Sequence, residues 1–207
     1  MLIWLTRSLS ARSSIARLGE IMRREIILSG AGGQGLILAG AILAEAAGVF
    51  EGKEVVQTQS YGIQARGGAS QSTVIIDDHR IRFPEVLAPD VLLCLSPEAH
   101  EQYVPRLRPG GILVVDQDLV NADCARADIT VLAFPFTAEG ERLNSRISAN
   151  VVALGALAVV TGWVKPGSLA KAIPGRLPQR HVARALEALE AGVRLAEAAK
   201  ATSDDRG

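Results

Sequence analysis

The sequence has few of the residues that cofactor-holding chains need. Its 207 residues include two cysteines, Cys94 and Cys124. Two thiolates cannot supply the four ligands of an iron–sulfur cluster, and neither cysteine lies at metal-ligand spacing from a histidine. Cys94 stands in the apolar run DVLLCLS, which predicts a small buried side chain. Low cysteine content is typical of a reducing compartment, so we expect a cytoplasmic protein.

Neither excess charge nor abundant aromatic side chains are present. Lys and Arg together number 22, Asp and Glu also number 22, and aromatic residues make up 4%. A general nucleic-acid binder needs a basic surface, and single-strand binders also need aromatic stacking platforms. The longest apolar run, Val151 to Val160, is too short to cross a bilayer about 30 Å thick. We therefore expect neither a nucleic-acid partner nor a membrane partner.

The familiar catalytic motifs are missing too. The sequence contains no nucleophile elbow, no phosphate-binding GxxxxGK[ST] loop and no HExxH motif. His79, His100 and His181 stand in polar surroundings and are interpreted as solvated or structural. Asp116 and Asp118 follow a strand and suit loop carboxylates better than metal ligands. We expect no catalytic residue and no metal site in this chain.

The first 21 residues stand apart from the rest. They are rich in Arg and Ser and contain no acidic residue before Glu20. Such composition suits a transit peptide, but it also suits a non-native extension or an upstream start, because Met22 directly precedes the first strand-like segment. In either case we expect residues 1–21 to lie outside the fold and residues 22–203 to form a single domain.

Short apolar segments alternate with helical patterns over the remaining chain. This order predicts an α/β fold, with a Rossmann-like, mostly parallel sheet, flanking helices and a helical C-terminal region. The expected strands span residues 23–30, 53–62, 69–77, 89–96, 109–118 and 128–134. The expected helices span residues 33–47, 97–103, a stretch from 135, the buried run 151–160, and 178–199.

Several local expectations accompany this fold. The alternating segment 69–77 predicts a half-exposed strand, and the step DDHR followed by IRF predicts a hairpin, hence an antiparallel element. Small residues along 33–47 should let that helix lie close to the sheet, with Gly48 ending it. Ser148 or Asn150 should cap the buried helix.

The stretch LSGAGGQGLILAG, residues 28–40, follows the first strand. Gly30, Gly32 and Gly35 have the spacing of a dinucleotide-binding loop, in which glycines admit a phosphate to a helix N-terminus. The simpler alternative is that they only permit tight strand–helix packing. A dinucleotide site also needs an acidic residue at the end of the second strand, but that strand ends VVQTQS and Glu54 stands at its beginning. The missing acidic residue therefore argues against a stand-alone NAD(P) site.

A second glycine-rich stretch, QSYGIQARGGASQS, covers residues 59–72. It follows the second strand, so we expect it at the same carboxyl edge of the sheet as the first loop. Arg66 offers a fork of donors suited to phosphate or carboxylate, although a surface turn with a locally paired Arg is the alternative. The candidate residues of this loop are Tyr61, Gly62, Arg66, Gly67 and Gly68.

The two stretches together resemble the gamma subunits of the 2-oxoacid:ferredoxin oxidoreductases. The motifs GxGGQG and SYGxxxRGG carry the resemblance, which extends over about residues 23–199. The segment EGKEVVQTQSYG is most similar to the 2-oxoglutarate branch, with the branched-chain 2-oxoacid branch next. Two departures are the segment 1–21 and the pair Ile63–Gln64, which stands where Pro–Glu is common.

The resemblance implies a division of labour. Enzymes of this family convert a 2-oxoacid and coenzyme A into an acyl-CoA, carbon dioxide and reduced ferredoxin. Thiamine diphosphate and Mg²⁺ lie between alpha and beta subunits, and a ferredoxin-like subunit holds 4Fe–4S clusters. This chain would hold no cofactor alone, would be inactive in isolation, and would have those subunits and external ferredoxin as partners.

The same resemblance implies a coenzyme A pocket at the two loops, with contacts to a cofactor or to a partner subunit. The implied residues are Gly30, Gly32, Gly33, Gln34, Gly35, Tyr61, Gly62, Arg66, Gly67 and Gly68. Two other functions stay open: an independent NAD(P)-dependent dehydrogenase, and a non-enzymatic module that binds a nucleotide or coenzyme A. The sequence does not fix which 2-oxoacid is used.

Overall fold

A six-stranded sheet runs through the centre of the molecule. The computed structural model describes residues 23–60, 70–123, 126–143 and 148–204. The strand order is β2-β3-β1-β4-β5-β6. The strands are β1 (Arg24–Gly30), β2 (Glu54–Ser60), β3 (Ser70–Asp77), β4 (Val91–Cys94), β5 (Ile112–Asp116) and β6 (Thr130–Phe134). The expected limits of the domain, 22–203, stay a prediction, since residues 1–22 lie outside the described part.

The strands β1, β4, β5 and β6 are parallel, as the sequence predicts. β3 lies between β1 and β2 and is antiparallel to both. Two antiparallel steps give β2 the same direction as β1. The prediction of a mostly parallel α/β sheet with an antiparallel element is confirmed.

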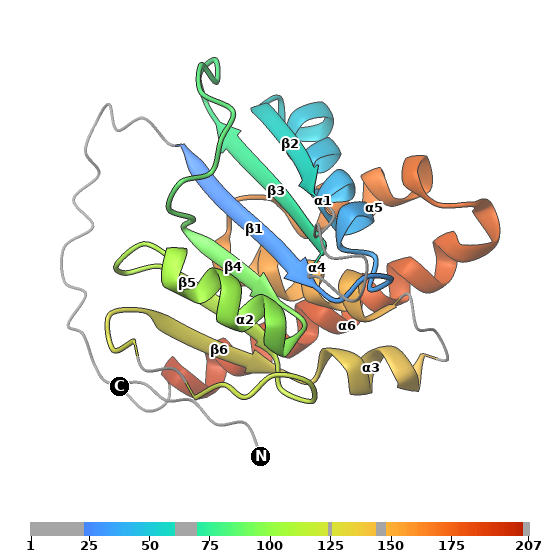
Figure 1. Ribbon diagram of the computed structural model, residues 1–207. Helices are drawn as coiled ribbons and strands as arrows, with labels where there is room; N and C mark the ends of the chain where they lie inside the picture. The colour runs from blue at the N-terminus through green and yellow to red at the C-terminus, as the bar shows by residue number, and fades with distance from the viewer. Residues whose placement is uncertain (1–22, 61–69, 124–125, 144–147, 205–207) are drawn as a thin grey trace.

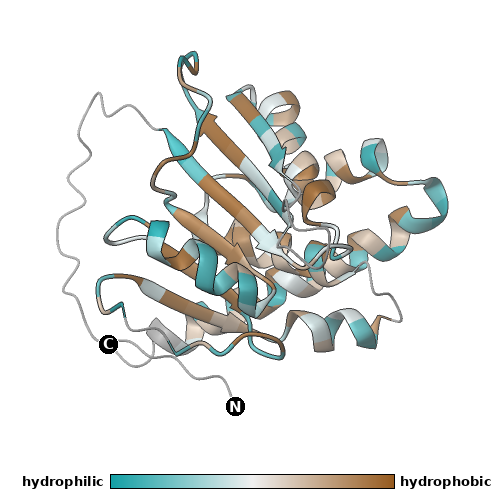
Figure 2. Ribbon diagram, in the orientation of Figure 1, coloured by the Kyte–Doolittle hydropathy of each residue, from teal (hydrophilic) through white to brown (hydrophobic). Residues whose placement is uncertain are grey.

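Helices cover both faces of the sheet (Figure 1). On one face α1, α4, α5 and α6 pack with the strands into the larger apolar cluster, whereas α2 packs into the smaller cluster on the other face. The apolar colouring of the central strands in Figure 2 matches this sandwich. The helices are α1 (Leu36–Glu45), α2 (Pro97–Tyr103), α3 (Phe136–Arg142), α4 (Ser148–Thr161), α5 (Pro166–Arg176) and α6 (Gln179–Asp204), with a π-helical turn η1 (Ala46–Phe50) and a 3₁₀ turn η2 (Val104–Arg106).

Glycine permits the closest approaches within the larger layer. A Cβ at Gly40 of α1 would overlap the Ser72 hydroxyl of β3, which confirms that small residues let this helix lie close to the sheet. A Cβ at Gly192 of α6 would overlap the Val152 carbonyl of α4, and one at Gly155 would overlap the Leu189 carbonyl of α6. The helices α4 and α6 therefore touch backbone to backbone.

The position predicted for the hairpin is wrong. Residues 78–90, including IRF, form no strand; β3 instead pairs antiparallel with the preceding strand β2 and with β1. The prediction of a half-exposed strand over 69–77 is also wrong, because β3 is buried almost throughout. Its polar side chains meet partners inside the sheet: Thr73 Oγ1 lies 2.5 Å from Thr58 Oγ1, and Ser72 Oγ accepts a hydrogen bond from Gln57.

Two predictions about helices are wrong. Gly48 does not end the first helix, which continues through η1 to Phe50 before Gly52 adopts a φ of 69°. Asn150 lies inside α4, which begins at Ser148, and its side chain bonds Gly35 instead of capping the helix. The helix α5 was not expected from the sequence, because Pro166 and Pro174 suggest a break.

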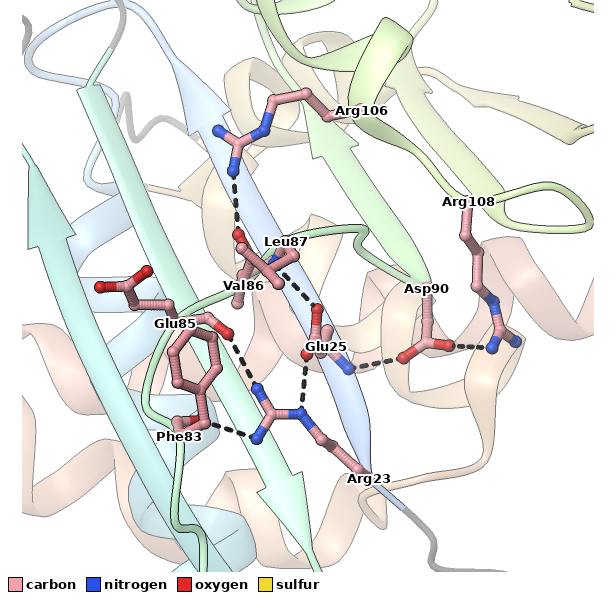
Figure 3. A network of polar contacts seen from close by, with 9 residues as sticks. All are labelled: Arg23, Glu25, Phe83, Glu85, Val86, Leu87, Asp90, Arg106 and Arg108. Carbon is pink, nitrogen blue, oxygen red and sulfur yellow. Dashed lines mark hydrogen bonds and ion pairs between the residues drawn. The ribbon is translucent and has the colours of Figure 1, made fainter.

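A polar network holds the segment before β4 against the amino end of β1 (Figure 3). The Glu25 backbone N–H donates to Asp90 Oδ2 at 2.6 Å, and Arg108 lies 2.6 Å from the other Asp90 oxygen. Arg23 donates to two carbonyl oxygens of the segment 83–87. This edge of the sheet is thus tied by side chains, opposite the edge that carries the glycine loop. Within the described residues, no helix is both long and apolar enough to span a membrane.

Candidate functional site

The first glycine loop lies where the winding of the sheet reverses. From β1 the chain passes through α1 to β2 on one side, and from β4 it passes through α2 to β5 on the other side. In open α/β sheets, ligands bind in the crevice at the carboxyl ends of such a strand pair. Gly30 ends β1, and Leu95 directly follows β4. The loop therefore occupies the ligand position of its fold class.

The side chain of Gln34 bridges this crevice. Its Oε1 accepts a hydrogen bond from the Ala31 N–H at 2.7 Å, and its Nε2 donates to the Leu95 carbonyl at 2.9 Å. Ser70 Oγ donates to the carbonyls of Gly30 and Ala31 at 3.3 and 3.4 Å. Protein groups thus satisfy much of the hydrogen bonding inside the crevice.

The glycines of the loop have different surroundings. A Cβ at Gly30 would overlap Gln34 Oε1 and lie 2.9 Å from Leu36 Cδ1, and a Cβ at Gly35 would overlap Asn150 Nδ2. By contrast, no atom of the described residues lies within 4 Å of the Cβ position of Gly32 or Gly33. The φ of 92° at Gly33 requires glycine at that position. Gly32 has no positive φ, and no described neighbour accounts for the lack of a side chain there. Gly32 therefore presents open backbone to solvent.

Asn150 holds the other end of the loop. Its Nδ2 donates to the Gly35 carbonyl at 2.8 Å, across 115 residues of sequence. Its Oδ1 is buried and has no hydrogen-bond partner among the described residues. The sequence analysis considered Asn150 only as a helix cap. No local signal identifies this contact, because it joins α4 to the start of α1.

The second loop leaves and re-enters the sheet at the same edge. Ser60, the last residue of β2, pairs with Gln71, and Ser70, the first residue of β3, pairs with Gly30. The prediction that both loops share one edge is therefore confirmed for the residues that flank the second loop. Tyr61, Gly62, Arg66, Gly67 and Gly68 themselves lie outside the described residues, and their contacts stay a prediction.

A cavity of about 280 Å³ opens beside Gly33 and Gln34. Its apolar wall includes Leu95 and the half-exposed Leu119, and its polar wall includes Asp116 and Glu141. No Lys or Arg is among the described residues that line it. The described part of this wall is therefore apolar and acidic.

Asp116 is a structural group in this wall. Its Oδ2 accepts hydrogen bonds from the Thr137 N–H and hydroxyl at 3.0 and 2.6 Å, and its Oδ1 accepts from the Asp118 N–H at 3.1 Å. Burial raises the pKa of the Asp116 carboxyl, and the Thr137 hydroxyl partly offsets that rise. The carboxylate thereby ties the end of β5 to the first turn of α3. His79, His100 and His181 do not line the cavity.

The described residues do not fit an iron–sulfur or metal centre. Cys94 is buried in β4, its thiol donates to the Ser96 carbonyl at 3.2 Å, and burial raises its pKa to about 12. One buried thiol cannot supply the four thiolate ligands of an iron–sulfur cluster. No three His, Cys, Asp or Glu side chains gather as metal ligands in the part of the chain that the structure describes.

The geometry also disfavours a dinucleotide. In the dinucleotide fold, the ribose-binding acid ends the strand next to β1. Here the neighbour on that side is the antiparallel β3, and β2 lies one strand further out. β2 ends with Gln59 and Ser60, and Glu54 lies at the opposite edge. The class defined by fold and site is therefore a doubly wound α/β domain whose described residues lack the ribose-binding acid of an NAD(P) site.

Comparison with known proteins identifies the family. Residues 25–195 match the family described as pyruvate ferredoxin/flavodoxin oxidoreductase, and the chain belongs to it. Subunit KorC of 2-oxoglutarate synthase from Methanocaldococcus jannaschii is 47% identical over 178 residues, which cover 85% of this chain and 95% of KorC. The chain is thus a homologue of gamma-type subunits, and the resemblance found in the sequence is confirmed.

Two solved structures extend this relationship. The keto/oxoacid ferredoxin oxidoreductase gamma subunit from Geobacter sulfurreducens superposes with a TM-score of 0.77 at 43% identity, over 85% of this chain and 97% of that one. The 2-oxoglutarate:ferredoxin oxidoreductase from Magnetococcus marinus, solved with 2-oxoglutarate, coenzyme A and succinyl-CoA bound, gives a TM-score of 0.74 at 26% identity. This chain covers 31% of that longer chain and is itself covered to 85%.

Proposed function

We propose that this chain is the gamma-type subunit of a 2-oxoglutarate:ferredoxin oxidoreductase. The complex would convert 2-oxoglutarate and coenzyme A into succinyl-CoA and carbon dioxide, and pass two electrons to ferredoxin. The 47% identity to a 2-oxoglutarate synthase subunit supports the choice of substrate, since that relative is matched over 95% of its length. The proposed location is the cytoplasm.

The proposed role of this chain is to complete the coenzyme A pocket of the complex. The open backbone at Gly32 carries this proposal, because a glycine without steric or conformational cause is a place for another molecule to come close. Gln34 would hold the loop in shape, and Gly30 and Gly35 would make room for the side chains that position it. Gly33 would supply the turn.

The second loop would complete the pocket from the other side. Ser60 pairs with Gln71, and Ser70 pairs with Gly30 at the start of the first loop. These pairings support a position of the second loop beside the first. Arg66 would meet a phosphate or carboxylate, Tyr61 would line the path toward the cofactors, and Gly62, Gly67 and Gly68 would let the backbone approach. These roles follow from the family motif together with that edge of the sheet.

The redox chemistry would belong to partner subunits. Alpha and beta subunits would bind thiamine diphosphate and Mg²⁺, and a ferredoxin-like subunit would hold 4Fe–4S clusters. The absence of a fitting thiol among the described residues is compatible with this division, since Cys94 is buried and protonated.

Affinity purification of the tagged full-length chain from its own cells tests the assignment. We expect thiamine-binding and cluster-binding subunits to co-purify, and intact-mass spectrometry to identify them. A single purified chain that oxidised a substrate with NAD would contradict the proposal.

A further inference from the structure

The crevice between β1 and β4 is filled by a side chain of the protein itself. Doubly wound sheets usually leave this crevice to a ligand, and the nucleotide-binding members place a diphosphate there. Here Gln34 reaches across it, from the glycine loop to Leu95. Gln34, which fills the crevice, directly precedes Gly35, the last glycine of the motif.

One of the two hydrogen bonds of Gln34 matches a contact that a bound diphosphate would make, and the other does not. A phosphate oxygen in such a loop accepts from backbone N–H groups, and Gln34 Oε1 accepts from the Ala31 N–H at 2.7 Å. The other end of the carboxamide donates to the Leu95 carbonyl at 2.9 Å, which a fully ionised phosphate cannot do. The Leu95 N–H is used as well, because it donates to the Ser29 carbonyl at 2.9 Å.

The space at the first glycine is filled in the same way. The three atoms nearest to the Cβ position of Gly30 belong to Gln34, Leu36 and Leu95. In a dinucleotide-binding loop, the first glycine makes the tight turn and the second lets the backbone approach the pyrophosphate. The space above the first glycine, Gly30, is taken by Gln34, so this glycine is explained without a ligand.

The charges nearby also oppose an anion. Asp116 and Glu141 line the adjoining cavity, and the described lining contains no Lys or Arg. Among the described residues of this lining, a diphosphate that entered the crevice would find no cationic partner to offset the loss of its hydration.

We propose that Gln34 is a specificity-determining residue that closes the crevice to nucleotide diphosphates. Molecules that contact the loop then do so over the open backbone of Gly32 and Gly33, on the outside of the crevice. Coenzyme A also carries a diphosphate, so in the proposed pocket that diphosphate would lie over this outer face and not between β1 and β4.

Calorimetric titration of the full-length chain with inorganic pyrophosphate tests the proposal. The unsubstituted chain should show no saturable binding at millimolar pyrophosphate. Gln34→Ala should free the Ala31 N–H and the crevice, and should bind pyrophosphate at least about tenfold more tightly. Asn150→Ala is the matched control, because it releases the far end of the same loop but leaves Gln34 in place, and it should gain no binding.

Equal gains in the two variants, or no gain in a folded Gln34→Ala, would overturn the proposal. A measurement on the unsubstituted chain keeps the test decisive if the variant does not fold. In NMR spectra, the side-chain amide of Gln34 and the backbone amide of Ala31 should stay unchanged when pyrophosphate is added. A saturable shift of both signals would mean that the anion displaces Gln34, and would refute its role as a closed gate.

Discussion

At the scale of single residues, one loop contains glycines with different physical causes. Gly30 and Gly35 make room for the side chains of Gln34 and Asn150, and Gly33 adopts a φ of 92°. Of these four glycines, Gly32 alone has no steric or conformational cause among the residues that the structure describes. The motif thus combines internal packing with one position that is open to another molecule.

Alanine substitutions should separate these two roles. Gly30→Ala forces a Cβ into Gln34 and should lower the free energy of unfolding by about 1–3 kcal/mol, as overpacking does. Gly32→Ala meets no atom and should change stability by less than about 0.5 kcal/mol. Urea unfolding of both variants measures this difference. Equal destabilisation by the two substitutions would show that Gly32 is also packed.

Cys94 should make the fold sensitive to alkaline pH. Burial raises the pKa of its thiol from 9.0 to about 12 in the folded chain. Because the folded pKa exceeds the unfolded one, the stabilising contribution is complete below pH 9.0 and is lost as the pH rises toward about 12. Within that window the loss approaches about 1.4 kcal/mol per pH unit.

The comparison with Cys94→Ala isolates this effect. Urea midpoints of both chains should be recorded below pH 9.0 and again about two units higher. The difference between the chains should move in favour of Cys94→Ala at the higher pH. Parallel pH profiles would mean that the Cys94 thiol is not protected by burial.

At the scale of elements, local patterns predict what a segment becomes but not what it meets. The β1–loop–α1 unit is predictable, because an apolar run, a glycine cluster and a helical stretch follow one another. The position of β3 between β1 and β2 is not, because strand pairing is set by distant contacts. The helix α5 is hidden by Pro166 and Pro174, although packing of its apolar face keeps it helical.

The candidate site follows the same division. The shared edge of the two loops could be predicted, since parallel strands bring their carboxyl ends together. The Asn150–Gly35 contact could not, because its partners are 115 residues apart. The bridge from Gln34 to Leu95 likewise depends on β4 lying beside β1, which no local pattern encodes.

The contact between α4 and α6 should tolerate no added side chain. Gly192→Ala would push a Cβ into the Val152 carbonyl, and the backbone cannot move aside cheaply. We expect a loss of about 3 kcal/mol or more, measured by urea unfolding. Gly167→Ala in α5 is the matched control, because its Cβ meets no atom and alanine favours a helix. A tolerated Gly192→Ala would contradict the close packing of these helices.

At the scale of the whole molecule, the two edges of the sheet differ in character. One edge is tied by the network of Arg23, Glu25, Asp90 and Arg108 (Figure 3). The other carries the first glycine loop and the flanks of the second. We interpret the first edge as structural and the second as the side that faces the rest of the complex.

Substitutions at the two edges should therefore act on different properties. In the assembled complex, Gly32→Ala and Arg66→Ala should each raise the KM for coenzyme A by about tenfold. The added methyl group of Gly32→Ala should keep coenzyme A from the backbone, and Arg66→Ala should remove a charge-assisted hydrogen bond. Asp90→Ala removes the acceptor of the Glu25 N–H, so it should lower stability by about 1–3 kcal/mol and leave that KM unchanged. Steady-state kinetics at saturating 2-oxoglutarate measure the constants. An unchanged KM for Arg66→Ala, with assembly intact, would remove Arg66 from the pocket.

We expect this chain to be a required subunit of a 2-oxoglutarate:ferredoxin oxidoreductase. The direct measurement is coenzyme A-dependent reduction of ferredoxin by 2-oxoglutarate, with the partner subunits reconstituted with and without this chain. We predict activity only when the chain is present, and more activity with 2-oxoglutarate than with pyruvate or a branched-chain 2-oxoacid. Full activity of the partner subunits without this chain would contradict the claim.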